Sequence, residues 1–171
     1  MAERFLGEIY LKVDAKARVL IPADFRAILK DDDPSSPDPA RPRMHMVYGG
    51  PMRAFVECYS KRAFEQLAAD IESMDEGDER DDAELNLLTR SVKVEVEPDG
   101  RIVLPPRVRE KLGLLGDETG EKAEVVFAGK SDRFHIYRRD IYEARFGNIA
   151  QVDKPDAPDP RKLVSMFKRR G

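Results

Sequence analysis

Asp14-Ala-Lys-Ala-Arg-Val-Leu-Ile-Pro22 is the stretch that decides the fold, because a second version of it occurs later in the chain. That version reads Glu97-Pro-Asp-Gly-Arg-Ile-Val-Leu-Pro105. Each version has an acid, three turn-type residues, an arginine, three apolar residues and a proline, in that order. A repeat with fixed internal spacing indicates that the chain contains two related structural units.

Each unit predicts the same succession of elements. Apolar and polar residues alternate over 5–13, which is typical of a half-buried strand. The acid and the residues after it form a turn, the apolar residues form a second strand, and the proline begins a short helix. A hairpin and a helix complete each unit, and the segments 56–59 and 134–137 occupy equivalent places in the two hairpins.

The sequence therefore predicts an α+β fold with two units, 4–74 and 88–147. The first unit contains an insert, 31–43, whose four prolines predict an irregular and mobile surface loop. Residues 75–87 are expected to form an acidic linker and the start of a helix at about residue 83. The Pro-rich and Lys/Arg-rich tail, 148–171, is predicted to be disordered.

Composition gives an expected compartment for the protein but does not show whether it binds nucleic acid. The 171 residues are 41% hydrophobic, and the formal net charge of −3 neither indicates nor excludes nucleic-acid binding, since a phosphate responds to local charge. The acids are concentrated in 31–33 and 75–82, which leaves the rest of the chain basic. The single cysteine is typical of a reducing cytoplasm, and no segment resembles a signal peptide or a membrane span. We therefore expect a cytoplasmic protein with no membrane partner.

The arginine of each motif is the candidate binding residue. A guanidinium group can bind a phosphate or the edge of guanine through two hydrogen bonds, which a lysine cannot do. The acid four residues earlier, Asp14 for Arg18 and Glu97 for Arg101, can accept N–H bonds and hold the arginine in one orientation. An alternative is that each acid–arginine pair only locks its hairpin, and the two interpretations are compatible. Lys16 lies in the same turn as Arg18 and is a further candidate binding residue.

Other polar residues give weaker signals. Arg26 and Arg109 follow the two prolines on short helices, where they either face solvent or contact flanking phosphates. His45, His135 and Cys58 lie within predicted strands and show no spacing typical of a metal site or a nucleophile. We therefore expect no catalytic residues, no metal, no cofactor and no small-molecule substrate.

The duplicated motif resembles the paired motifs of the MraZ family of bacterial transcription regulators, over about residues 4–147. The resemblance implies two tandem AbrB-like repeats, each a swapped-hairpin β-barrel with short helices, packed about a pseudo-twofold axis. It also implies ring-shaped homo-oligomers that bind short direct repeats in double-stranded DNA, associate with the nucleoid and repress the division and cell-wall gene cluster.

Two departures from the family pattern make the motifs unequal. Ala17 replaces the glycine that Gly100 retains, and Glu97 replaces an aspartate that Asp14 retains. We therefore expect Arg18 to matter more for DNA binding than Arg101.

A second hypothesis is an oligomeric scaffold that binds another protein through its acidic runs and tail. An enzyme is a third hypothesis, with the least support. The scaffold would form oligomers that never associate with DNA, whereas the regulator would prefer a repeat-containing promoter fragment to a scrambled one.

Overall fold

The computed structural model describes residues 3–115, 123–147, 149 and 157–169. Its elements, in chain order, are β1 (Glu8–Lys12), β2 (Arg18–Leu20), α1 (Ala23–Asp31), β3 (Arg43–Val47), β4 (Val56–Ser60), α2 (Lys61–Glu72), α3 (Asp78–Ala83), the π-helix η1 (Glu84–Thr89), β5 (Ser91–Glu95), β6 (Arg101–Val103), α4 (Pro106–Leu112), β7 (Glu124–Gly129), β8 (Arg133–Arg138), α5 (Arg139–Phe146) and α6 (Pro160–Phe167). The predicted mixed α+β class is confirmed.

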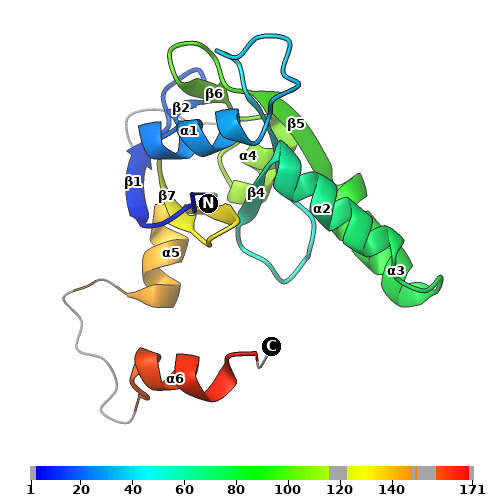
Figure 1. The fold of residues 1–171 in the computed structure, drawn as a ribbon. Coiled ribbons are helices and arrows are strands. Elements are labelled where there is room, and N and C mark those ends of the chain that lie inside the picture. Colours follow the sequence, from blue (N-terminus) through cyan, green and yellow to red (C-terminus); the bar gives the residue numbers. More distant parts are fainter. Residues whose placement is uncertain (1–2, 116–122, 148, 150–156, 170–171) are drawn as a thin grey trace.

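The strands of the two units are interleaved in one antiparallel sheet. Its order is β1-β7-β8-β4-β3-β5, and β2 and β6 form a separate two-stranded ribbon. The first strand of each unit pairs with a strand of the other unit, since β1 pairs with β7 and β5 pairs with β3. The ribbon and α1 lie at one end of the molecule, and α5 lies below β7 (Figure 1).

The core is one cluster of buried side chains that both units supply. Phe25 on α1 packs against Phe134 on β8 with ring centroids 4.9 Å apart, and against Phe5, ahead of β1, at 5.1 Å. Such aromatic pairs add to the large area that each ring buries. The helix of the first unit is thus fixed on strands of the second.

Several elements follow from local signals in the sequence. Side chains alternate between exposed and partly buried along β1, as the pattern of residues 5–13 predicted. Ser60 caps α2, since its hydroxyl accepts a hydrogen bond from the Ala63 amide at 3.2 Å. Gly113 ends α4 in the left-handed conformation, with a φ of 69°.

The insert 31–43 is irregular between its two ends, where Asp31 closes α1 and Arg43 opens β3, and one of its acids is buried rather than solvated. Asp33 is 4% exposed. Arg43, at the start of β3, donates to it from its amide and Nε at 2.9 Å and from Nη2 at 2.7 Å. The Arg43 guanidinium is the largest cause that holds the pKa of Asp33 below its usual value. Because this pair joins the two ends of the insert, it fixes where the loop leaves and re-enters the fold.

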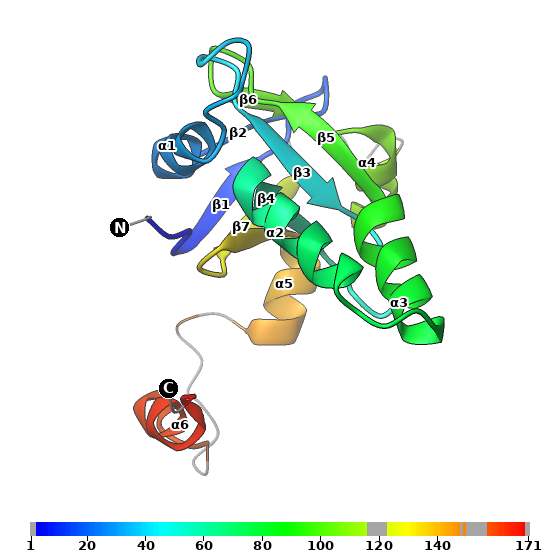
Figure 2. The same cartoon turned by 45° about the vertical axis from the view of Figure 1, so that its right-hand side comes forward.

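The acidic stretch predicted as a linker is largely helical. The helix expected from about residue 83 begins at Asp78 as α3 and continues through η1. Asp78, Glu79 and Asp81 lie in the first turn of α3, where negative side chains interact favourably with the positive end of the helix dipole. The helix α2 runs outward and α3 and η1 return beside it, so together they form an arm that projects from the sheet (Figure 2).

The prediction of a disordered tail is wrong for residues 160–167, which form α6. Pro160 occupies the first turn, and the Asp159 carboxylate caps it by accepting a hydrogen bond from the Arg161 amide at 2.8 Å. The helix stands apart from the sheet in both views (Figures 1 and 2). Residues 149, 157–159 and 168–169 of the predicted tail are described and lie outside α6, whereas residues 148, 150–156 and 170–171 lie outside the described residues.

Candidate nucleic-acid interface

The two motifs meet in the ribbon of β2 and β6. Val19 pairs with Ile102 at its centre, and both side chains are buried. Because side chains alternate between the two faces of a strand, the flanking residues project to the opposite, outward face. That face carries two arginines and two partly exposed apolar residues, Arg18, Arg101, Leu20 and Val103.

The first turn holds its arginine through Asp14. The Asp14 carboxylate accepts hydrogen bonds from the Lys16 amide at 2.9 Å and from the Arg18 amide and Arg18 Nε at 2.8 Å each. The Arg18 amide is the largest cause that holds the pKa of Asp14 below its usual value, and partial burial opposes it. The structure thus places Asp14 where it orients the Arg18 guanidinium.

The second turn holds its arginine through a different acid. Glu97 closes the turn with its backbone, since its amide donates to the Arg101 carbonyl and its carbonyl accepts from the Gly100 amide, both at 2.8 Å. Asp99 accepts hydrogen bonds from the Arg101 amide at 3.1 Å and from Arg101 Nη1 at 3.0 Å. The expectation that Glu97 orients Arg101 is therefore wrong, because Asp99 at the tip of the turn reaches both groups.

Arg26, on α1 of the first unit, lies over the turn of the second unit. A Cβ atom added to Gly100 would lie 1.6 Å from Arg26 Nη1 and 2.7 Å from Arg26 Cζ. Gly100 also has a φ of 86°, which favours glycine. Arg109, the equivalent helix residue, is partly buried, and its Nε has no hydrogen-bond partner among the described residues. The helix arginines are thus packed against the body and do not form a simple solvated face.

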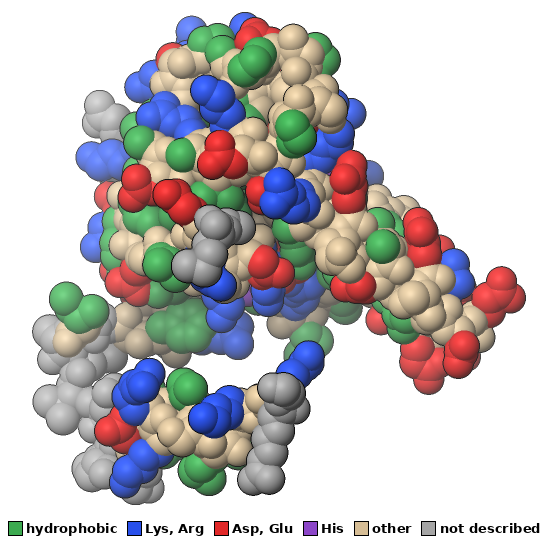
Figure 3. Space-filling model, in the orientation of Figure 1, with side chains coloured by type: hydrophobic (Ala, Val, Ile, Leu, Met, Phe, Trp, Pro, Cys, Tyr) green, Lys and Arg blue, Asp and Glu red, His purple; other side chains and the backbone are tan. Residues whose placement is uncertain are grey.

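The two turns remain accessible to a ligand. The side chains of Arg18 and Arg101 are 35% and 43% exposed, and Lys16 is exposed. Ion pairs this exposed contribute little to stability, so their effect here is mainly to orient the arginines. Lysine and arginine side chains are visible along this end of the molecule, whereas acids gather at the tip of α3 (Figure 3).

A buried charge cluster that the sequence patterns did not predict joins the two units at the centre of the sheet. Glu57 on β4 is 5% exposed. It accepts hydrogen bonds from Tyr59 Oη at 2.6 Å and Arg133 Nε at 2.8 Å, and it pairs with Arg53 Nη2 at 2.8 Å. His135 Nε2 lies 3.1 Å away. Burial raises the pKa of Glu57, but the hydrogen bonds from His135, Arg53 and Tyr59 lower it by more than burial raises it. The net effect is a lowered pKa, so the carboxylate is ionised.

Residues 3–115, 123–147, 149 and 157–169 contain no group of three potential ligand side chains placed to hold a metal ion. No helix in this part of the chain is long and apolar enough to cross a membrane.

Comparison with known proteins relates the chain to one family. The family model described as "MraZ protein, putative antitoxin-like" matches residues 87–163. The chain is 42% identical over 165 residues to "Transcriptional regulator MraZ" of Cereibacter sphaeroides (strain KD131 / KCTC 12085), covering 96% of this chain and 97% of that protein. It is 34% identical over 170 residues to the protein of the same name from Ruegeria sp. (strain TM1040), covering 96% of each chain.

Proposed function

For this chain, which belongs to the MraZ family, we propose the function of a sequence-specific DNA-binding regulator of transcription. The observation that carries the proposal is the ribbon of β2 and β6, which presents two oriented arginines on one face. The major groove of B-DNA admits a two-stranded β-ribbon, and arginine bound to guanine is the commonest specific contact there.

The hydrogen bonds of the two arginines suit this role. Asp14 engages Nε of Arg18, and Asp99 engages Nη1 of Arg101, so each guanidinium keeps further N–H donors for a base edge or a phosphate. Because each arginine is already held by an acid, it loses less conformational entropy on binding. Lys16 adds a positive charge beside the first turn, and Arg26 adds one behind the second.

The proposal includes a finer description of the fold as two AbrB-like swapped-hairpin repeats about a pseudo-twofold axis. The strand registers support it. Val19 faces its equivalent Ile102, and Glu57 faces its equivalent His135, so each ladder contains a pair of equivalent positions that face each other. The reciprocal pairing of β1 with β7 and of β5 with β3 supports the exchange of strands between units.

The proposed active form is a ring of identical subunits on short direct repeats in a promoter. A ring that presents one ribbon per subunit would bind tandem repeats multivalently, so individually weak contacts would combine into strong binding. Repression of the division and cell-wall gene cluster, in the cytoplasm at the nucleoid, is the regulatory role that we propose with it.

The test compares a promoter duplex that carries tandem repeats with a scrambled duplex at one salt concentration. We expect the wild-type protein to prefer the repeat duplex, and Arg18→Ala to weaken that binding without changing the fold or the oligomer size. Arg62→Ala is the matched control, because Arg62 is an exposed arginine on α2, away from the ribbon. Equal affinity for the two duplexes would contradict the proposal, and loss of folding in Arg18→Ala would indicate a structural role for the pair.

One observation favours the scaffold hypothesis as a second candidate. The helix α6 exposes an apolar face that includes Leu163, Val164 and Phe167, the last with 75% of its surface accessible. A face of this kind can bind another protein. Light scattering with and without DNA distinguishes the two functions, because a scaffold would form oligomers that do not change when the repeat duplex is added.

A further inference from the structure

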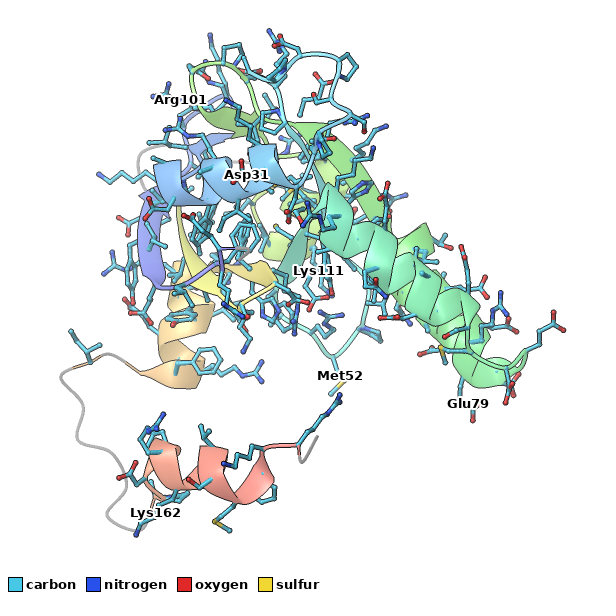
Figure 4. The ribbon with its side chains drawn as sticks, viewed as in Figure 1. Asp31, Met52, Glu79, Arg101, Lys111 and Lys162 are labelled. Atoms are coloured by element: carbon cyan, nitrogen blue, oxygen red, sulfur yellow. The ribbon has the colours of Figure 1, made fainter. Side chains whose placement is uncertain are left out.

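A second positively charged site lies on α4 and at the end of η1. It is a cleft of about 370 Å³ lined by Tyr48, Arg90, Arg107, Glu110 and Lys111. Lys111 lies near the middle of the body and Arg101 at its upper end, so the cleft is separate from the ribbon (Figure 4). The proposed contacts of the two turns do not account for it.

The π-helix η1 fixes the position of Arg90. The Arg90 amide donates to the Leu85 carbonyl at 3.0 Å, which is the five-residue hydrogen bond of a π-turn. The Arg90 carbonyl accepts from the Tyr48 amide at 2.9 Å. Since both backbone groups of Arg90 are engaged, its side chain extends into the cleft from a fixed backbone. Single π-turns of this kind are frequent at functional sites.

The opposite wall of the cleft is tied to the same helix. The Gly50 amide donates to Asn86 Oδ1 at 2.9 Å, and the Gly50 carbonyl accepts from Lys111 Nζ at 2.8 Å. A Cβ atom added to Gly49 would lie 2.1 Å from the Asn86 carbonyl oxygen, so only glycine fits there. The loop after β3, η1 and α4 are therefore joined by direct contacts, and the cleft is preformed.

The charges in the cleft are not balanced. Glu110 pairs with Arg107 at 3.2 Å, but within the described part of the chain no acid lies within ion-pair distance of Arg90. Burial, followed by repulsion from Arg53 and Arg90, lowers the pKa of Lys111 below its usual value. A site in which cations repel one another is stabilised when an anion enters it.

From these contacts we infer that the cleft binds a phosphate group. The guanidinium groups of Arg90 and Arg107 supply paired N–H donors, which match the geometry of phosphate oxygens, and Lys111 supplies a further positive charge. The volume of the cleft also admits a compact group attached to the phosphate. The phosphate belongs either to the DNA backbone or to a small phosphorylated compound. The inference does not depend on the proposed function, because a small ligand would satisfy it alone.

The primary test is titration of the full chain with inorganic pyrophosphate, measured by calorimetry at low salt. We expect saturable binding, and an affinity about tenfold lower in Arg90→Gln, since this change removes charged hydrogen bonds. Arg62→Gln is the matched control, because it makes the same change of charge on α2, outside the cleft. Thermal unfolding verifies that both variants fold. Absence of saturable binding, or equal affinity in wild type and Arg90→Gln, would overturn the inference.

A second measurement identifies the source of the phosphate. If it belongs to DNA, Arg90→Gln weakens binding to the repeat duplex and to the scrambled duplex alike, and reduces the salt dependence by about one ion. If it belongs to a small compound, Arg90→Gln binds pyrophosphate about tenfold more weakly and keeps both DNA affinities. Failure of the proposed DNA-binding function can be distinguished from failure of the proposed phosphate site. Arg18→Ala tests DNA binding by the ribbon and is expected to leave pyrophosphate binding unchanged.

Discussion

The two units face each other at equivalent positions in two places, and the side chains there differ in kind. In the ribbon, Val19 meets Ile102, so two apolar residues bury each other. In the sheet, Glu57 meets His135, so an acid meets a base. A chain with two identical units would place like against like at both positions, and two facing glutamates would repel each other. The duplication has therefore allowed the units to become complementary.

The surroundings of the sheet pair show the same complementarity. Glu57 is contacted by Arg133, whereas His135 is stacked at 4.0 Å against Phe55, which holds the place in the first unit that Arg133 holds in the second. The charged Glu57 thus has a charged neighbour, and the aromatic His135 has an aromatic one. The paired residues of the two units are therefore of the same kind in the ribbon, where the units are proposed to read DNA, and of opposite kinds in the sheet, where the units join.

The strongest test of this comparison is Glu57→Gln. Without the carboxylate charge, the guanidinium groups of Arg53 and Arg133, whose side chains are 27% and 31% exposed, lose their buried counter-charge. Loss of such charged hydrogen bonds costs about 1.5–3 kcal/mol. We expect the free energy of unfolding, measured by urea titration, to fall by that amount. The exchange of Glu57 with His135 in a double variant should recover little, because Arg133 and Phe55 are arranged for the native order. Full recovery of the free energy of unfolding would show that the Glu57–His135 pair determines stability independently of Arg133 and Phe55.

The ribbon gives the next largest effect. We expect Arg18→Ala to weaken DNA binding by about 1–3 kcal/mol per site, as for loss of an arginine–guanine contact, and Arg101→Ala to weaken it less. Asp14 and Asp99 each accept one amide bond and one side-chain bond from their own arginine, but Asp14 also accepts a bond from the Lys16 amide, which fixes the first turn more firmly. Anisotropy titrations of the two variants measure the difference, and a larger loss in Arg101→Ala would reverse the ranking.

The two turns also differ at the position that Gly100 occupies in the second unit and Ala17 in the first, and the expected effect there is smaller. Gly100→Ala places a Cβ against Arg26 and a side chain at a φ of 86°, and left-handed backbone costs an L-residue about 1–2 kcal/mol. Ala17 already adopts a φ of 60° in the equivalent place, so Ala17→Gly should change stability by less than about 1 kcal/mol. Thermal unfolding of Gly100→Ala and Ala17→Gly measures the two changes in stability. Equal destabilisation would contradict the asymmetry.

The smallest effect is in the titration of the two turn acids. The pKa of Asp14 and that of Asp99 are both lowered, chiefly by the amides of Arg18 and Arg101. A lowered folded-state pKa means that the contribution of each acid to stability is present above its ordinary value of 3.8 and is lost as the pH falls through the folded value. We expect carbon-detected NMR to find both pKa values still lowered after the arginines are replaced by alanine, because the backbone amides remain. A return of either to its ordinary value would assign the effect to the guanidinium group.

Much of the fold could be predicted from the repeat, because equivalent residues occupy equivalent places and local signals such as Ser60 and Gly113 act on their own neighbours. The acid that holds Arg101 could not be predicted from the sequence, since the choice between Glu97 and Asp99 depends on the conformation of the turn. The Glu57 cluster was also hidden, because its partner Arg133 is distant in sequence and a lone acid in a strand pattern indicates a solvent-facing position. The helix α6 was masked by a composition typical of a disordered tail.

The strand order also determines when this protein can fold during its synthesis. β1 is made first, yet its neighbour β7 belongs to the second unit, and β4 must wait for β8. The ribosome therefore has to complete most of the chain before the sheet can close, and until then the first unit exposes unpaired strand edges. Pairing between distant segments is slow to form. Until the second half is made, the edges of the nascent first half are free to pair with other chains.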